Sequence, residues 1–191
     1  MDEFVFARRG ELLAVPAAVL VARGKPSALS IAIGLPLAFA GEAIRAWAVG
    51  YSGVTTRGDA VTAPALVTAG PYAYMRNPLY AGNFITALGF AVAFTGANEP
   101  FARAALVAGA LGTMLAVYGV VVPHEERYLR GAFGAEFDAY VAAVPRIVPR
   151  TAPGGTQAGS YDPSVIGRAE SRTFITFGLM LLALAVKART K

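Results

Sequence analysis

Two long stretches without any charged side chain constrain this chain more than any other feature. Pro78 to Ala97 and Ala104 to Pro123 each run for twenty residues without Asp, Glu, Lys or Arg. As α-helices, segments of this length measure about 30 Å, which matches the hydrocarbon layer of a bilayer. Both stretches are therefore predicted to be transmembrane helices.

A third segment, Ala28 to Gly50, is also long enough to span, although it carries Glu42 and Arg45. Charged groups are tolerated at that depth when they face a protein interior or a wet cavity. The chain of 191 residues is 55% hydrophobic and only 15% charged, which is more apolar surface than a soluble domain of this size can bury. These observations predict an integral membrane protein.

The uncharged runs near the two ends of the chain are shorter. Leu12 to Ala22 has eleven residues and Thr173 to Val186 has fourteen, so each is interpreted as a short tilted span or a re-entrant piece. The first run resembles the core of a signal peptide, but Asp2 and Glu3 replace the usual basic leader, and we expect it to be retained. The predicted fold class is an all-α, polytopic transmembrane helical bundle with about five spans.

The distribution of arginines favours one orientation. In a five-span topology the long polar segments, residues 51–77 and 124–172, share one face of the membrane. Basic residues concentrate in cytoplasmic loops, so this face is predicted to be cytoplasmic. A complete last span would instead place three basic residues outside, which argues against it: Lys187, Arg189 and Lys191. The arginines of the predicted cytoplasmic face are Arg8, Arg9, Arg57, Arg76, Arg127, Arg130, Arg146, Arg150, Arg168 and Arg172.

After the fourth predicted span, apolar residues recur at intervals of three and four, which is typical of an amphipathic helix at a membrane interface. Pro145 and Pro149 end this helix, and residues 151–159 are rich in Gly, Thr and Ala, as in a mobile linker. The chain is thus divided into a membrane domain over residues 1–150, a linker over 151–172 and a C-terminal hydrophobic helix over 173–191. The apolar residues of the amphipathic helix are Leu129, Phe133, Phe137, Tyr140, Val141 and Val144.

Glycines recur within the predicted spans. Gly82, Gly89 and Gly96 are seven residues apart and so lie near one helix face, and Gly109 and Gly112 follow in the next span. Small residues let helix backbones approach closely in lipid. We expect these glycines to serve helix packing.

The composition excludes several kinds of site. The chain has no cysteine, so disulfides, thiolate nucleophiles and Cys-ligated metals are excluded, and the single histidine, His124, disfavours a multi-histidine metal site. The net charge of +5 is scattered over the loops without a basic stripe. It therefore favours anionic membrane lipids over nucleic acid as partners.

Residues 66–82 form the first cluster that can carry chemistry. Gly70 and Pro71 suit a tight turn, and Pro78 suits the first turn of a helix. Such a turn exposes backbone N–H groups at a helix N-terminus, where an anionic ligand group is favoured. One interpretation is a ligand site with aromatic faces from Tyr72 and Tyr80, and the other is an interfacial aromatic belt.

The second cluster, residues 124–128, lies where the fourth predicted span ends. It holds Glu125 and Glu126 beside His124. Three interpretations compete: a solvated cap at headgroup level, a metal site, and a group that holds the amine or ribose hydroxyls of a ligand. Neighbouring side chains on a helix point about 100° apart, which disfavours a shared metal ion.

The third cluster lies within the predicted span from Ala28 to Gly50. Glu42 and Arg45 are three residues apart and so share a helix face. They form either a structural ion pair or, with Asn83 and Tyr51, a polar pocket for a substrate headgroup.

Taken together, these motifs resemble a family of membrane enzymes, the isoprenylcysteine carboxyl methyltransferase and phospholipid methyltransferase group. The resemblance covers roughly residues 28–150. It rests on Gly70-Pro71-Tyr72, Arg76-Asn77-Pro78-Leu79-Tyr80-Ala81-Gly82, Glu125-Glu126, Phe133-Gly134, Phe137, Tyr140, Val144-Pro145-Arg146 and Pro149.

The resemblance implies S-adenosylmethionine bound at the cytoplasmic face and a lipidic substrate that enters from the bilayer. It implies that Arg76 and Glu126 orient cofactor or substrate as candidate catalytic residues, and that no metal takes part. Glu42, Arg45 and Asn83 are the expected substrate-binding residues. The implied cofactor-binding residues are Leu66, Val67, Tyr72, Asn77, Pro78, Tyr80 and Glu125.

Two departures from the family pattern bear on the substrate. Asn77 stands where the most familiar form of the motif has histidine, and it can form hydrogen bonds but cannot carry charge. The isoprenylcysteine enzymes place an arginine about one turn before the acidic pair, whereas this chain has valine at positions 120–122. A prenylated-protein substrate is therefore doubtful unless Arg45 replaces that arginine.

The prediction is a membrane methyltransferase that uses S-adenosylmethionine on a small lipidic acceptor, either a carboxylate of the isoprenylcysteine type or an amine of the phospholipid type. Two other hypotheses are kept. One is a membrane reductase similar to the sterol reductases, which would use NADPH, and the other is a helical scaffold without catalytic activity. The oligomeric state is left open.

Overall fold

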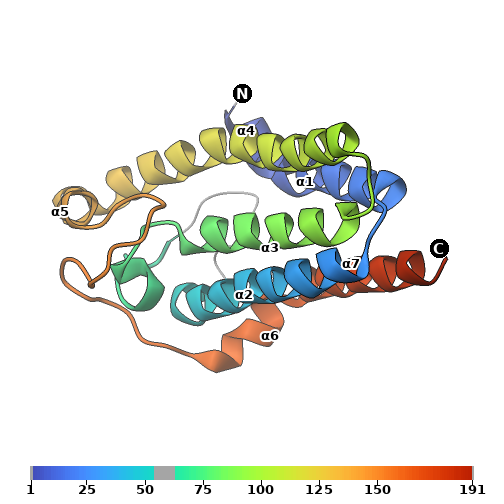
Figure 1. Ribbon diagram of the computed structural model, residues 1–191. Coiled ribbons are helices and arrows are strands. Elements are labelled where there is room, and N and C mark those ends of the chain that lie inside the picture. The colour runs from blue at the N-terminus through green and yellow to red at the C-terminus, as the bar shows by residue number, and fades with distance from the viewer. Residues whose placement is uncertain (1, 54–62, 191) are drawn as a thin grey trace.

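The computed structural model describes residues 2–53 and 63–190, so Arg57 and Lys191 lie outside the described residues. Every regular element in these ranges is helical, which confirms the predicted all-α class. The long helices lie roughly parallel to one another (Figure 1). They are α1 (Asp2–Arg23), α2 (Ala28–Ser52), α3 (Pro78–Thr95), α4 (Pro100–Phe133) and α7 (Ser171–Arg189); the short ones are η2 (Gly70–Ala73), α5 (Ala135–Ala143), η3 (Pro163–Val165) and α6 (Ile166–Ala169).

Within the described residues, four helices are long and apolar enough to cross a membrane: α2, α3, α4 and α7. The last of them has 19 residues and ends at the opposite end of the bundle, where Lys187 Nζ donates to Gly24 O over 2.7 Å. Helix α1 has 22 residues, but Asp, Glu and Arg side chains occupy its first half. A fifth span through α1 stays a prediction.

Glycines let α2 and α3 approach closely, as their spacing predicts. A Cβ atom at Gly82 would lie 2.7 Å from Arg45 Cγ and 2.8 Å from Gly41 O. Two turns further along α3, a Cβ atom at Gly89 would lie 2.6 Å from Gly34 O. This close packing of α2 on α3 holds Arg45 against Gly82 and Asn83 of α3.

The same prediction is wrong for the glycines of α4. A Cβ atom at Gly109 or Gly112 would meet no atom of another described helix within 4 Å, because this side of α4 faces outward. Small size alone does not tell which face of a helix is covered.

The predicted amphipathic helix after the fourth span is two helices instead of one. α4 has 34 residues and is about 51 Å long, so its last turns extend beyond a hydrocarbon layer of about 30 Å. Gly134, with φ of 51°, then breaks the helix, and α5 follows at an angle (Figure 1). The apolar face predicted for this region is nevertheless buried, since Phe137, Tyr140 and Val144 form a cluster with Leu66.

Residues 151–162, predicted as a linker, pack against the turn that precedes α3. Thr68 N and Ala69 N both donate to Ala158 O, at 2.9 and 3.0 Å, and Thr68 Oγ1 donates to Thr156 O at 2.6 Å. Gly154 N donates to Ala73 O at 2.8 Å. The segment therefore runs along the edge of the turn and leads the chain to α7. The domain boundaries at residues 150 and 172 stay predictions.

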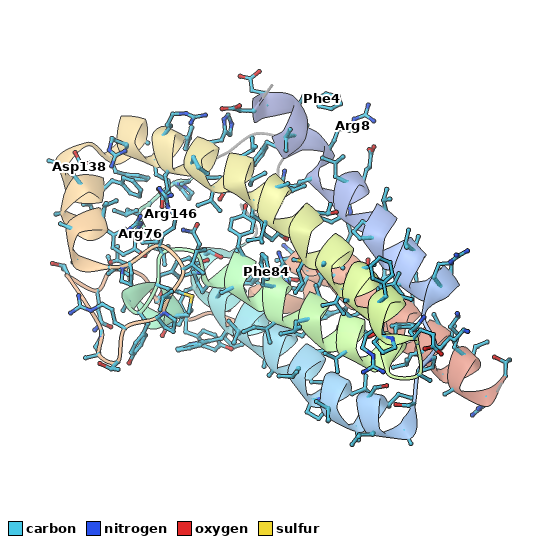
Figure 2. The ribbon with its side chains drawn as sticks, turned by 45° about the horizontal axis from the view of Figure 1, so that its top comes forward. Phe4, Arg8, Arg76, Phe84, Asp138 and Arg146 are labelled. Carbon is cyan, nitrogen blue, oxygen red and sulfur yellow. The ribbon has the colours of Figure 1, made fainter. Side chains whose placement is uncertain are left out.

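The opposite end of the bundle is closed by two short loops. Lys25 N donates to Asn98 Oδ1 over 2.7 Å, and Asn98 Nδ2 donates to Arg23 O over 3.0 Å. Ala97 N donates to Lys25 O over 2.7 Å. These bonds join the α1–α2 loop to the α3–α4 loop. The longer connection from α4 to α7, residues 134–170, lies at the other end, where Asp138, Arg146 and Arg76 gather beyond Phe84 of α3 (Figure 2).

Candidate functional site

The turn before α3 places the first cluster. Gly70 has φ of 61°, and a Cβ atom there would lie 2.5 Å from Tyr51 Cζ, so the position favours glycine on two grounds. Tyr74 N and Met75 N donate to Pro71 O, and Pro78 begins α3. The predicted tight turn followed by a helix is confirmed.

Main-chain bonds join this turn to the segment after α5. Arg76 N donates to Pro145 O at 2.8 Å. Asn77 donates to Arg146 O from both its backbone N, at 3.2 Å, and its Nδ2, at 3.1 Å. These bonds hold the first predicted cluster against the segment after α5, which lies about seventy residues further along the chain.

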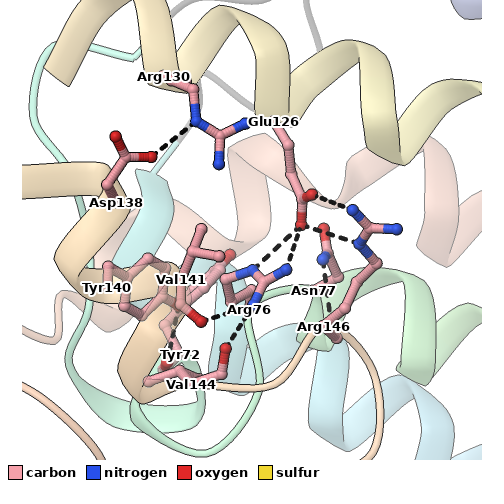
Figure 3. Close-up of polar contacts among 10 residues, drawn as sticks. All are labelled: Tyr72, Arg76, Asn77, Glu126, Arg130, Asp138, Tyr140, Val141, Val144 and Arg146. Carbon is pink, nitrogen blue, oxygen red and sulfur yellow. Dashed lines mark hydrogen bonds and ion pairs between the residues drawn. The ribbon is translucent and has the colours of Figure 1, made fainter. Parts of the chain in front are cut away.

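Glu126 lies between two arginines at this junction (Figure 3). Its Oε1 accepts from Arg76 Nε at 3.1 Å and Nη2 at 3.0 Å, and Arg146 donates to both carboxylate oxygens. Arg76 Nη1 also donates to the carbonyls of Val141 and Val144 at the end of α5. Hydrogen bonding to Glu126 raises the pKa of Arg146. The side chains of the two predicted catalytic residues, Arg76 and Glu126, therefore form contacts that join α4, the turn before α3 and the end of α5.

The neighbouring carboxylate, Glu125, points elsewhere. Its Oε1 accepts from the Tyr80 hydroxyl at 2.6 Å, and the Tyr80 ring lies 4.5 Å from the ring of Tyr118. Two adjacent glutamates thus serve two different surroundings, as expected from their angular separation on a helix. His124 packs its ring 5.4 Å from Phe6 of α1.

The third cluster is a buried ion-pair network. Arg45 Nη2 donates to Glu170 Oε2 at 2.6 Å, and Arg45 Nε lies 3.7 Å from Glu42 Oε2. Arg45 also donates to Asn83 Oδ1, and Asn83 Nδ2 donates to the Tyr118 hydroxyl at 2.8 Å. The ion pair predicted between Glu42 and Arg45 is present, whereas the predicted pocket for a substrate headgroup stays a prediction.

One cavity of about 830 Å³ brings these clusters together. Its size is within the range of small-molecule sites. Of the twelve predicted site residues, all except Glu42 line it; Glu42 lines an adjoining apolar pocket of about 200 Å³. Their binding and catalytic roles stay predictions. The residues of the set that line the cavity are Leu66, Val67, Tyr72, Asn77, Pro78, Tyr80, Glu125, Arg76, Glu126, Arg45 and Asn83.

Two tyrosines form a further part of the wall. The Tyr140 hydroxyl donates to Tyr72 O at 2.7 Å, and desolvation by burial raises the pKa of both phenols. Both rings therefore remain neutral at physiological pH and offer aromatic faces and hydroxyl groups to a ligand.

Sequence reasoning missed several residues of the cavity wall. Glu170 is only 1% exposed and reaches Arg45 from 125 positions away, and no local pattern marks it. The sequence did contain a signal for Tyr118, because it is the one tyrosine within the uncharged stretch from Ala104 to Pro123. Arg9 and Arg172 were counted only as basic residues of one membrane face, although both line the cavity.

Comparison with known proteins gives a family and two curated relatives. A model of the phospholipid methyltransferase family matches residues 29–136. Over 85 residues, the chain is 38% identical to the cobalt-zinc-cadmium resistance protein CzcN of Cupriavidus metallidurans and 36% identical to the nickel-cobalt-cadmium resistance protein NccN of Alcaligenes xylosoxydans xylosoxydans. The aligned part is 44% of this chain and 36% of each relative, so the match spans about a third of the relatives' length. No solved structure matches.

Proposed function

Because this chain belongs to the phospholipid methyltransferase family, we propose that it moves a methyl group from S-adenosylmethionine to a small lipidic acceptor at the cytoplasmic face of the membrane. The family is one of methyltransferases, and the four apolar helices make the chain an integral membrane protein. The donor, the acceptor and the membrane face are the proposal.

The observation that carries the proposal is the chemical variety of the residues that line the cavity of about 830 Å³. A methyl donor of this kind has an aromatic base, hydroxyl groups, a cationic sulfonium and both ends of an amino acid. The cavity offers aromatic faces at Tyr72 and Tyr80, a carboxylate at Glu125 and a guanidinium at Arg9. Leu66 and Val67 add backbone groups and apolar contacts beside them.

Methyl transfer from a sulfonium is an in-line displacement, in which the acceptor atom bonds to the methyl carbon as the carbon–sulfur bond breaks. The protein contributes mainly orientation and exclusion of water. We assign Glu125 and Tyr80 to holding the polar end of the donor. Arg76 and Glu126 act as positioning residues, since their hydrogen bonds fix the turn and α5 around the cavity.

The network at Arg45 is assigned to the acceptor side of the cavity. A carboxylate acceptor needs no general base, whereas an amine acceptor releases a proton that a carboxylate takes up. Glu170 and Glu42 are the two carboxylates beside Arg45, and we assign the uptake of this proton to one of them. Asn83 connects the network to Tyr118 at the cavity wall.

The proposed orientation rests on the basic residues of the two ends. Those at the cavity end outnumber those at the closed end, which supports a cytoplasmic cavity. In the described residues the closed end has Arg23, Lys25, Arg103, Lys187 and Arg189, and the cavity end has Arg8, Arg9, Arg76, Arg127, Arg130, Arg146, Arg150, Arg168 and Arg172.

Calorimetry with S-adenosylhomocysteine on the detergent-solubilised protein tests the proposal. Glu125→Gln and Tyr80→Phe are expected to weaken binding about 10- to 100-fold, the effect of losing a hydrogen bond to a charged group. Glu136→Gln, on the exposed face of α5, is the matched control and should bind as the wild type does.

Binding of NADPH without binding of S-adenosylhomocysteine would overturn the proposal in favour of a reductase. Binding of neither ligand would favour a scaffold. A membrane lipid extract incubated with the protein and a radiolabelled methyl donor then identifies the acceptor fraction.

A further inference from the structure

The apolar pocket next to the large cavity lies between the first and the last helix. Leu13, Ala17 and Leu20 of α1 line one side, and Phe177 and Met180 of α7 line another. Side chains of α3 and α4 complete it, together with Glu42 of α2. Five residues line both this pocket and the large cavity, so the two spaces adjoin: Leu13, Asn83, Tyr118, Thr173 and Thr176.

The two helices that flank this pocket lie outside the region that matches the family, residues 29–136. They meet at the closed end of the bundle, where Lys187 Nζ donates to Ala22 O at 3.1 Å and Gly24 O at 2.7 Å. Toward the cavity end, side chains of both helices line the pockets instead. The space between α1 and α7 is thus a groove, closed at one end and continuous with the cavity at the other.

Arg172 lies in the first turn of α7, where this groove meets the cavity. Three other arginines near the site have carboxylate partners: Arg45 pairs with Glu170, and Arg76 and Arg146 pair with Glu126. Across the described ranges, no carboxylate forms an ion pair with Arg172, and the residue is exposed. Its positive charge therefore remains available to a ligand.

We propose that the groove between α1 and α7 binds the acceptor lipid, with an anionic group of the lipid at Arg172 and its hydrocarbon chain in the apolar pocket. This inference rests on the proposed function, because it assigns the acceptor site of the same reaction. Charge complementarity at Arg172 and the apolar lining beyond it select an anionic lipid as the occupant.

The size of the pocket limits how much of the lipid it encloses. A volume of about 200 Å³ holds roughly seven groups the size of a water molecule at about 30 Å³ each. The enclosed part of the chain is therefore short. A longer chain leaves the groove between α1 and α7 and continues into the bilayer.

Photo-crosslinking on the full-length protein in neutral nanodiscs tests the groove and its charge. Three single-chain probes carry the same diazirine-labelled chain on a phosphate, a carboxylate or an uncharged glycerol. The two anionic probes are expected to label peptides of α1 and α7 about two- to fivefold more than the glycerol probe, the effect of one partly exposed ion pair. If one of the two anionic probes labels far more strongly, that probe shows whether the anion is a phosphate or a carboxylate.

Two matched pairs of variants separate the charge from the groove. Arg172→Gln should reduce the labelling by anionic probes to the level of the glycerol probe, whereas Arg168→Gln, an exposed arginine outside the cavity lining, should not. Ala17→Phe fills the pocket and should abolish labelling by all probes. Ala18→Phe, on the outer side of the same helix, should leave it unchanged.

Equal labelling by the three probes would overturn the role of Arg172, and equal labelling of Ala17→Phe and Ala18→Phe would overturn the groove. Binding of S-adenosylhomocysteine is measured on every variant. If the wild type binds that ligand but the variants label alike, the groove is wrong and the proposed methyl transfer stands. Absence of that binding in the wild type is a failure of the proposed function itself.

Discussion

The two ends of the bundle are built in opposite ways. At the closed end, loops of four residues, 24–27 and 96–99, connect the helices, and the Asn98 side chain of the second loop bonds to the backbone of Arg23 and Lys25. At the cavity end, residues 63–77 lead into α3 and residues 134–170 connect α4 to α7, and ion pairs of Glu126 and Arg45 hold the elements around a volume of about 830 Å³. Short loops close a bundle completely, whereas long connections held by charged side chains leave space for a ligand.

The comparison predicts the largest loss of stability at the cavity end. Arg45→Met leaves Glu42 and Glu170 buried without their counter-charge and should lower the free energy of unfolding by about 3–5 kcal/mol. Unfolding in mixed detergent micelles measures the loss. Adding Glu170→Gln should recover part of it, and Arg168→Met on the surface serves as the control. A loss below about 1 kcal/mol would mean that the network does not hold this end together.

A smaller effect is expected in the middle of the bundle, where α2 and α3 touch. Gly89→Leu should destabilise the protein by about 1–3 kcal/mol, because the side chain has no room beside Gly34. Gly112→Leu on the open face of α4 should change the same unfolding midpoint little. Equal effects of the two substitutions would show that the open face of α4 is covered in the membrane.

The smallest effect is expected at the closed end. Asn98→Ala removes the acceptor for Lys25 N and the donor to Arg23 O and should lower the free energy of unfolding by about 1 kcal/mol. Affinity for S-adenosylhomocysteine should not change, whereas Arg146→Gln at the cavity end should weaken it. A tenfold loss of affinity in Asn98→Ala would contradict the separation of the two ends.

Much of the candidate site was predictable because its residues sit in short motifs. The turn at Gly70 and Pro71, the helix start at Pro78 and the pair Glu125 and Glu126 carry their chemistry within a few positions. Local geometry decides such features, so eleven of the twelve predicted residues line one cavity. Glu42 differs because it lies one helical turn before Arg45 and therefore lines the adjoining pocket.

Two features that local residue patterns did not predict share a cause. The periodicity of apolar residues continues across Gly134, and this pattern predicted one helix. The structure has two helices, α4 and α5, which are separated at Gly134. Residues 151–162 are rich in small residues, yet Thr68, Ala69 and Ala73 bond to their backbone. A residue pattern reports local preference, and these outcomes depend on partners that are distant in sequence.

The sequence by itself determined that this is a helical membrane protein with its polar motifs toward one end, because uncharged stretches of twenty residues and a turn followed by Pro78 depend only on neighbouring residues. Only the tertiary structure decided that Glu170 pairs with Arg45, that Glu125 and Glu126 serve different surroundings, and that α1 and α7 border one groove. A buried charge is stable only with a partner, and that partner can come from any part of the chain.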